Sequence, residues 1–203
     1  MIIDTKDLPI KIETRVVNQV TVTEELTAYQ AMVQVAQEYR DKYEAIPISE
    51  VPRIQNARTF FRSIGIDPTK RRPSSEALLR RAVNGKELYQ INNIVDVGNW
   101  CSLEFLLPIC VYDYTNIKGK VSVKIGSSQD SYLAHNNREM NFENKFVVCD
   151  EEGAFGSPLT DSIRTAVTSD TKSLLLIIFA PEDYDSEMLK KQMDVLENRV
   201  LNN

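Results

Sequence analysis

The side chains best suited to covalent chemistry in this chain are three cysteines and a single histidine. The thiols belong to Cys101, Cys110 and Cys149, and the imidazole to His135. A cysteine becomes a nucleophile when a base lies within hydrogen-bond reach, so Cys110 paired with His135 is one hydrolase hypothesis. A buried cysteine that packs as a small hydrophobe is the commoner case. The sequence leaves both interpretations open.

The same residues argue against a metal centre and a disulfide framework. The number of cysteines is odd and none forms a C-x-x-C pair, which favours a reduced, cytoplasmic protein. With one histidine, zinc ligands would have to come from scattered positions, so no metal site is predicted. The glycine-rich phosphate loops and the motifs of serine hydrolases and zinc proteases are also missing. We therefore expect no cofactor.

Two short basic clusters are the candidates for contact with phosphates. Their residues are Lys70, Arg71, Arg72, Arg80 and Arg81. Such side chains position a nucleic acid on the protein surface; the alternative is a solvated or salt-bridged helix edge. The formal net charge is -5, whereas a dedicated nucleic-acid binder carries a basic excess. The five charges would therefore have to be focused on one face to attract a nucleic acid, and no DNA-binding role is predicted.

Hydrophobic periodicity predicts helices in the first half of the chain and at its end. Leu26, Tyr29, Val33 and Ala36 recur at three- and four-residue spacing, which is typical of an amphipathic helix over 24–43. Similar patterns predict helices at 53–64, 75–83, 91–107 and 186–201.

From Pro108 the pattern changes to short β-rich segments between polar turns. Strands are expected within 9–23 and at 109–114, 120–125 and 144–149, and the apolar run 174–179 indicates a buried strand. The predicted class is α+β, with an antiparallel or mixed sheet or barrel core and flanking helices. Specifically, 109–125 and 132–149 should form antiparallel strands of one sheet, with helices 24–43 and 75–83 packed outside it.

The length and composition of the chain fit one globular domain over residues 1–203. The chain has 203 residues, of which 42% are hydrophobic, enough to build a core. No run of 18 apolar residues exists, so no membrane contact is predicted. The N-terminus lacks the apolar stretch of a signal peptide, and this again favours a cytoplasmic protein.

Six motifs in a fixed order carry a family resemblance. They are G-I-D-P-T-K (65–70), R-P-S-S-E-A-L-L-R-R (72–81), I-N-N-I-V-D-V-G-N-W (91–100), L-P-I-C-V-Y-D (107–113), C-D-E-E-G (149–153) and V-T-S-D-T-K (167–172). Their order resembles the editing module of the phenylalanyl-tRNA synthetase beta subunit, formed by its fused third and fourth domains, and is most similar to free-standing members. The resemblance covers about 50–180. The strand–helix segment 9–45 and the helix 186–201 flank it.

The resemblance implies an amino-acid pocket. In the synthetase this module hydrolyses the ester between tyrosine and the tRNA 3′ end, since an apolar pocket rejects an added hydroxyl by only about 100-fold. By resemblance, Glu139 would accept the tyrosine hydroxyl, Gly119 would let the backbone approach the ligand, and Asn99 would position the ester or water. Gly98 and Cys110 stand where the synthetase has Thr and His. These two departures leave the amino acid and the retention of hydrolysis open.

Three functions therefore compete. The first is a tRNA-binding, editing-type domain that hydrolyses a mischarged aminoacyl-tRNA in trans. The second is a non-catalytic module on the same fold that binds a free amino acid or a small aromatic ligand. The third is a protein–protein adaptor that uses the terminal helices. No complete aminoacyl-tRNA ligase is expected, because the ATP-binding motifs of synthetases are missing.

Overall fold

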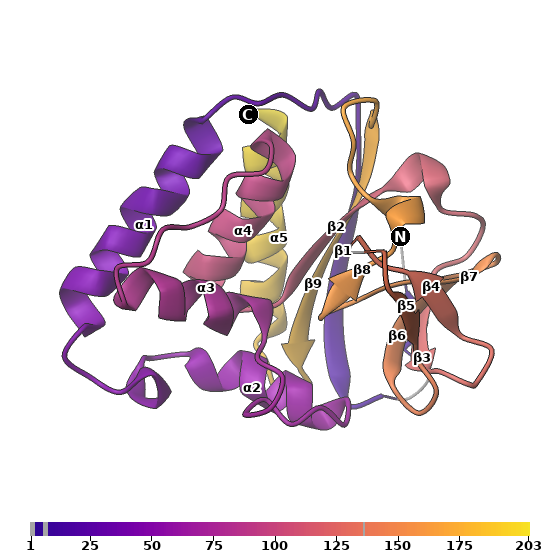
Figure 1. Ribbon diagram of the computed structural model, residues 1–203, viewed down its shortest axis with the longest axis horizontal. Coiled ribbons are helices and arrows are strands. Elements are labelled where there is room, and N and C mark those ends of the chain that lie inside the picture. Colours follow the sequence, from indigo (N-terminus) through magenta and orange to yellow (C-terminus); the bar gives the residue numbers. More distant parts are fainter. Residues whose placement is uncertain (1–2, 6–7, 136) are drawn as a thin grey trace.

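The computed structural model describes residues 3–5, 8–135 and 137–203, and it has an α+β fold (Figure 1). The helices are α1 (Thr27–Tyr43), α2 (Ile54–Ser63), α3 (Ser74–Val83), α4 (Asn93–Phe105) and α5 (Ser186–Leu201). The strands are β1 (Ile10–Asn18), β2 (Ile109–Asp113), β3 (Ser122–Ile125), β4 (Ser131–Leu133), β5 (Glu139–Asn141), β6 (Phe146–Asp150), β7 (Gly153–Ser157), β8 (Thr160–Asp161) and β9 (Ser173–Pro181). All pairings between these strands are antiparallel.

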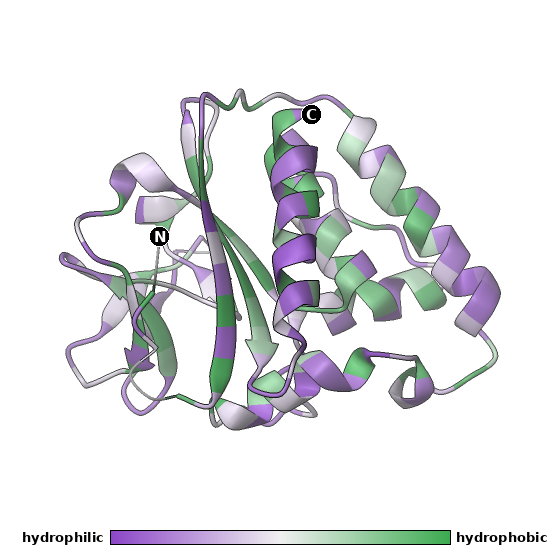
Figure 2. Cartoon of the chain, turned by 180° about the vertical axis from the view of Figure 1, so that it is seen from behind, coloured by the Kyte–Doolittle hydropathy of each residue, from purple (hydrophilic) through white to green (hydrophobic). Residues whose placement is uncertain are grey.

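The strand β9 lies in the centre of a three-stranded sheet of order β1-β9-β2. It pairs with β1 along its whole length and with β2 over Leu174–Ile178. Figure 2 shows β9 as a hydrophobic strand beside the alternating colours of β1. A strand with neighbours on both edges and cover on both faces needs apolar side chains at every position. This explains the apolar run 174–179 and confirms the expected buried strand.

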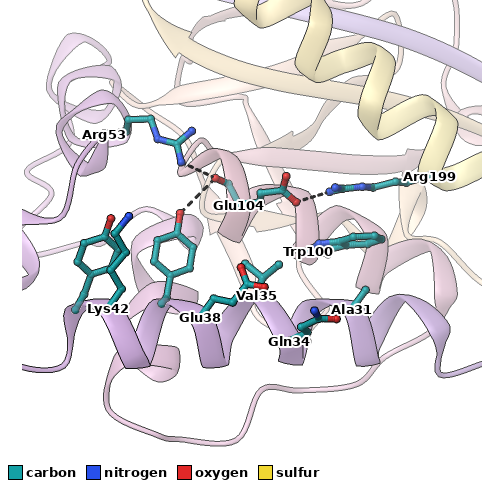
Figure 3. Close-up of a pocket in the computed structure, with 11 residues that line it drawn as sticks. Ala31, Gln34, Val35, Glu38, Lys42, Arg53, Trp100, Glu104 and Arg199 are labelled. Atoms are coloured by element: carbon teal, nitrogen blue, oxygen red, sulfur yellow. Dashed lines mark hydrogen bonds and ion pairs between the residues drawn. The ribbon is translucent and has the colours of Figure 1, made fainter.

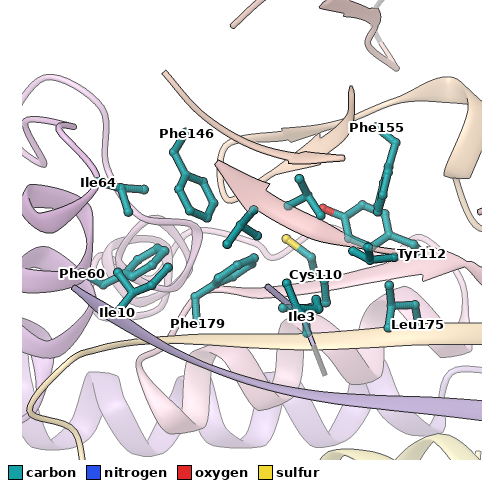
Figure 4. Close-up of a cluster of buried hydrophobic side chains, with 14 of the residues drawn as sticks. Ile3, Ile10, Phe60, Ile64, Cys110, Tyr112, Phe146, Phe155, Leu175 and Phe179 are labelled. Atoms are coloured by element: carbon teal, nitrogen blue, oxygen red, sulfur yellow. The ribbon is translucent and has the colours of Figure 1, made fainter. Parts of the chain in front are cut away.

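Alternate residues of β9 enter two different hydrophobic clusters. Leu174, Leu176 and Ile178 pack with α4 and α5, whereas Leu175 and Ile177 pack with α2, β3 and β6. Successive side chains of a strand point to opposite faces, so one strand supplies both cores. Figure 4 shows the second cluster, with Phe179, Phe60 and Phe146 gathered between the sheet and its cover. The helices α4 and α5 thus cover one face of the sheet, and α2 covers the other together with the smaller β layer. Figure 1 shows the β layer on the opposite side of the sheet from α4 and α5.

The segments 109–125 and 132–149 do not form one sheet, so that prediction is wrong. β2 belongs to the central sheet, β3 and β6 belong to a sheet of order β3-β6-β7-β8, and β4 pairs only with β5. The chain turns at Tyr114–Asn116, where the Asp113 carboxylate accepts the amide N–H of Thr115 at 2.9 Å. The late strand β9 takes the edge of β2 that a local hairpin would have used. The described strands form open sheets and no closed barrel.

Four of the five described helices, α1, α3, α4 and α5, form two layers on one side of the sheet. α4 and α5 contact the central strands, whereas α1 and α3 pack on α4. The predicted helices 24–43 and 75–83 therefore lie outside the sheet, but one layer further out than expected. The terminal elements are part of this core, since β1 pairs along all of β9 and α5 packs on β1. No helix in the described part of the chain is long and apolar enough to cross a bilayer.

A buried ion pair joins α2 to α3. Glu76 is only 1% exposed, and its carboxylate accepts hydrogen bonds from Arg58 Nε at 2.7 Å and Arg80 Nε at 2.9 Å. Burial acts to raise the pKa of Glu76, but the hydrogen bonds from the two arginines outweigh it and the pKa is lowered. A buried charge with both partners in place is tolerated, and removing one partner leaves it uncompensated.

We expect Arg58→Ala to destabilise the fold by about 3 kcal/mol at pH 7, because it strips a buried carboxylate of its main partner. Arg62→Ala, on the exposed side of the same helix, should stay within about 0.5 kcal/mol of the wild type. The stabilisation by a lowered carboxylate pKa is present above the unfolded pKa and is lost as pH falls through the folded pKa. Urea denaturation at pH 7 and below pH 4 measures both effects. Equal losses for the two variants at pH 7 would contradict the assignment.

Candidate functional site

A hollow of about 330 Å³ lies where α4 meets β2, and we call it the Cys110 hollow. It is lined by Ile91, Val95, Gly98, Asn99, Ile109, Cys110, Val111, His135, Asp161, Ala166 and Val167. Two of the sequence motifs, 91–100 and 107–113, supply most of this lining. The structure thus brings together three of the five residues proposed for the amino-acid pocket, namely Gly98, Asn99 and Cys110.

Close packing between α4 and β2 accounts for the glycine at position 98. A Cβ atom on Gly98 would lie 3.0 Å from Cγ2 of Val111. This separation is shorter than an ordinary van der Waals contact, so a larger residue would push the helix from the strand. The Thr of the synthetase motif would not fit here without such a shift.

Cys110 is a neutral thiol in an apolar surrounding. The residue is 6% exposed, and its Sγ donates to the carbonyl oxygen of Ser157 at 3.6 Å. Burial raises the pKa of Cys110 well above its ordinary value. Figure 4 shows the thiol among the hydrophobic side chains between the sheets. His135 lines the same hollow, but no hydrogen bond joins it to Cys110. The geometry therefore favours Cys110 as a packing residue over a nucleophile.

Asp161 is the polar group that the sequence did not single out. It is a residue of the short strand β8, and its Oδ1 is buried with no hydrogen-bond partner. Burial raises the pKa of Asp161 to about 6, an effect that the nearby Tyr112 hydroxyl partly opposes. Nothing in the local sequence marks this carboxylate, since only the pairing of β8 with β7 brings it to the hollow. A buried, unpaired carboxylate is costly and is typical of functional sites.

Glu139 lies in a different hollow, which we call the Glu139 hollow. This space has a volume of about 440 Å³ and is lined by Gly65, Ile66, Asp67, Lys70, Arg71, Glu139, Met140, Asn141, Phe142, Lys145, Phe146, Ser157, Leu159 and Thr160. Glu139 is exposed, and the Ser131 hydroxyl donates to its Oε1 at 3.4 Å. Thr160 lines this hollow and Asp161 the other, as expected when neighbouring side chains point to opposite faces of a strand.

Gly119 lies in neither hollow. Its φ is +65°, and a Cβ atom there would lie 2.0 Å from the carboxyl carbon of Glu151. The same carboxylate accepts the amide N–H of Lys120 at 3.4 Å. The glycine is required by this turn between the Tyr114–Asn116 segment and β3. The expected grouping of Glu139 and Gly119 with Cys110 therefore does not occur in the structure.

Four of the five basic residues proposed for phosphate contact surround one hollow of about 530 Å³, which we call the basic hollow. Its lining is Lys70, Arg72, Ala77, Arg80, Arg81, Asn84, Lys86 and Tyr89. Five of these residues are cationic and none is acidic, in a chain of net charge -5. Within the described residues, Lys70, Arg72 and Lys86 form no ion pair. Arg71 faces the Glu139 hollow instead.

A further hollow of about 430 Å³ between α1, α4 and α5 is held together by its own polar groups (Figure 3). The Glu104 carboxylate pairs with Arg199 at 2.7 Å, and the Arg199 guanidinium lies 3.6 Å from the ring centroid of Trp100. Tyr39 and Arg53 both donate to the carbonyl oxygen of Glu104. These contacts tie helices to one another, so this hollow is better explained by packing than by ligand binding. Across the described residues, no group of three or more potential ligands is placed to hold a metal ion.

A family model and the sequences of known relatives indicate the same family for this chain. A model of the B3/4 domain matches residues 56–192. Two relatives are phenylalanine–tRNA ligase beta subunits of Neisseria meningitidis, of serogroup B (25% identical over 126 residues, 60% of this chain and 16% of that one) and serogroup A (27% over 108 residues, 51% and 14%). The subunit from Bartonella henselae is 28% identical over 105 residues, covering 51% of this chain and 13% of that one. The chain thus spans 13 to 16% of the length of these relatives.

One solved structure is similar in part. It is an N-terminal fragment of the phenylalanyl-tRNA synthetase beta subunit from Pyrococcus horikoshii, with 16% identity and a TM-score of 0.45. The match covers 53% of this chain and 39% of that one.

We expect Asp161→Asn to stabilise the protein at pH 7.5 and to have little effect at pH 4. A carboxyl group whose folded pKa is raised contributes stability below the unfolded pKa, and this is lost as pH rises from about 4 through about 6. Urea midpoints of both proteins across this range measure the difference. Asp170→Asn, at an exposed turn, is the matched control and should show no such pH dependence. A constant gap between wild type and Asp161→Asn would contradict burial of the charge.

Proposed function

The chain belongs to the B3/4 domain family, and from that premise we propose that it is a tRNA-binding, editing-type domain that hydrolyses a mischarged aminoacyl-tRNA in trans. We further propose that residues 1–203 act as one unit. The observation that carries the proposal is the Cys110 hollow, where two motifs of the family resemblance meet a buried, unpaired carboxylate.

The groups around this hollow suit an aminoacyl ester. Asn99 offers an amide that can orient the ester carbonyl or a water molecule. Asp161, when ionised, can hold the α-ammonium group of the amino acid, and a pKa of about 6 leaves it largely ionised at neutral pH. The reaction would consume one water molecule, break the ester bond and release the free amino acid and the tRNA 3′ hydroxyl.

The Glu139 hollow supports the second candidate, a binding module for a small aromatic ligand. Its floor includes Phe142, Phe146 and Leu159, and its rim carries Glu139 together with Lys145. Apolar walls with a few polar groups are typical of small-molecule sites. Glu139 as the acceptor of a phenolic hydroxyl then belongs to this hollow, on the other face of β8 from Asp161. The adaptor function has no such specific support.

Incubation with a panel of mischarged tRNAs, with release of each amino acid scored, tests the hydrolase. We expect release of at least one amino acid, and Asp161→Asn should slow it at least tenfold while Asp170→Asn leaves it unchanged. Stabilisation by a free aromatic amino acid without any release would favour the binding module instead. No release and no stabilisation would contradict both functions.

Binding of tRNA should depend on salt through the basic hollow. The double variant Lys70→Ala, Arg72→Ala removes two cations without ion pairs, so the log–log salt slope should fall by about 1.5 and affinity should drop for every tRNA species alike. The charge-matched control is Lys190→Ala, Lys191→Ala on α5. Affinities measured between about 50 and 200 mM salt give both slopes. If the control lost as much affinity and salt slope as the test variant, binding would depend only on the net charge of the protein.

A further inference from the structure

An aromatic side chain stands exposed at the edge of the basic hollow. Tyr89 lies in the connector between α3 and α4 and is 65% exposed. The guanidinium carbon of Arg81 lies 4.2 Å from the centroid of its ring and covers part of it. The high exposure leaves the rest of the ring open to solvent. Unpaired nucleic-acid bases stack on aromatic rings and on guanidinium groups, and both are present here.

The connector that carries Tyr89 is fixed on both sides of this residue. Before it, the Tyr29 hydroxyl donates to the carbonyl oxygen of Leu88 at 3.2 Å, and the Leu88 side chain is buried. After it, the Ile91 amide N–H donates to Asp96 Oδ1 at 3.0 Å. Tyr89 is therefore presented by an anchored backbone, and a ligand would not have to order it. Such preorganisation lowers the cost of binding.

The position of the connector gives this ring a specific role. Tyr89 lines the basic hollow, whereas Ile91, two residues further on, lines the Cys110 hollow. Figure 1 shows the connector running from the end of α3 to the start of α4. A nucleic acid whose phosphates lie on Lys86 and Arg72 would meet Tyr89 before its end reached the Cys110 hollow. The aminoacylated end of a tRNA is single-stranded, so its bases are free to stack.

We propose that Tyr89 is a stacking subsite for an unpaired base near the 3′ end of the tRNA, with Arg81 as the positioning residue beneath it. The inference deepens the proposed function and rests on it. In this arrangement the basic hollow attracts the phosphates of the RNA, and Tyr89 stacks on a base. Stacking is tolerant of sequence because every base has an aromatic face, so the subsite distinguishes single-stranded ends from paired ends and not one base from another.

The test uses the full chain and two RNA hairpins with the same stem, one with an unpaired 3′ C-C-A end and one blunt. Affinities for both are measured by fluorescence anisotropy across a salt series, for wild type, Tyr89→Leu and Tyr89→Phe. We expect Tyr89→Leu to weaken binding of the overhang RNA by about 5- to 100-fold. Its salt slope should not change, since no cation is lost. Tyr89→Phe keeps the ring and should bind like wild type, and the blunt RNA should not distinguish the three proteins.

The possible results distinguish failure of the stacking subsite from failure of the proposed function. Equal binding of the overhang RNA by wild type and Tyr89→Leu, with a normal salt slope, would overturn the stacking subsite and leave tRNA binding intact. Equal weakening of both RNAs by Tyr89→Leu would also overturn it, because the effect would then not depend on an unpaired base. Absence of salt-dependent binding by wild type to either RNA would overturn the proposed function and the subsite with it.

Discussion

The rest of the structure depends on the burial of β9 on both faces and both edges. One face holds α4 and α5, and the other holds α2 and the smaller β layer. The edges are taken by β1, from the start of the chain, and by β2, from its middle. Because the last strand is inserted between two earlier ones, the sheet is complete only when 173–181 is in place. The Cys110 hollow adjoins this unit, since both α4 and β2 line it.

The Cys110 hollow and the Glu139 hollow are separate because side chains alternate between the two faces of β8. Thr160 and Asp161 are neighbours in sequence, yet they line different spaces. The Cys110 hollow is lined by Asp161, which has one buried carboxylate oxygen without a hydrogen-bond partner, and the lining of the Glu139 hollow includes Phe142 and Phe146. Glu139 and Cys110, which the family resemblance assigns to one pocket, therefore line different hollows. At Gly98, α4 packs so closely on Val111 that a side chain would require a small shift of its neighbour.

The charge distribution is uneven, so the acidic net charge of the chain does not conflict with the proposed binding of tRNA. Carboxylates elsewhere set the net charge at -5, but the described lining of the basic hollow contains none. The Glu76 carboxylate, which pairs with the lining residue Arg80, is buried and also pairs with Arg58. Exposed cations that lack partners dominate the local potential over about 10 Å at moderate salt. The attraction of an anion to this surface therefore depends more on the clustered cations than on the net charge of the chain.

The sequence by itself determined the helices, most strands, the buried character of 174–179 and the family, because these depend on local periodicity and on motif order. The family resemblance also implied that Gly98, Asn99 and Cys110 belong to one pocket, and all three line one hollow. The tertiary structure alone decided that β2 pairs with β9 and β3 with β6, that Glu139 and Gly119 lie away from Cys110, and that Asp161 enters the hollow. These features depend on pairing between residues tens of positions apart. The cost of closing such loops changes slowly with their length, so local sequence carries little information about which strands meet.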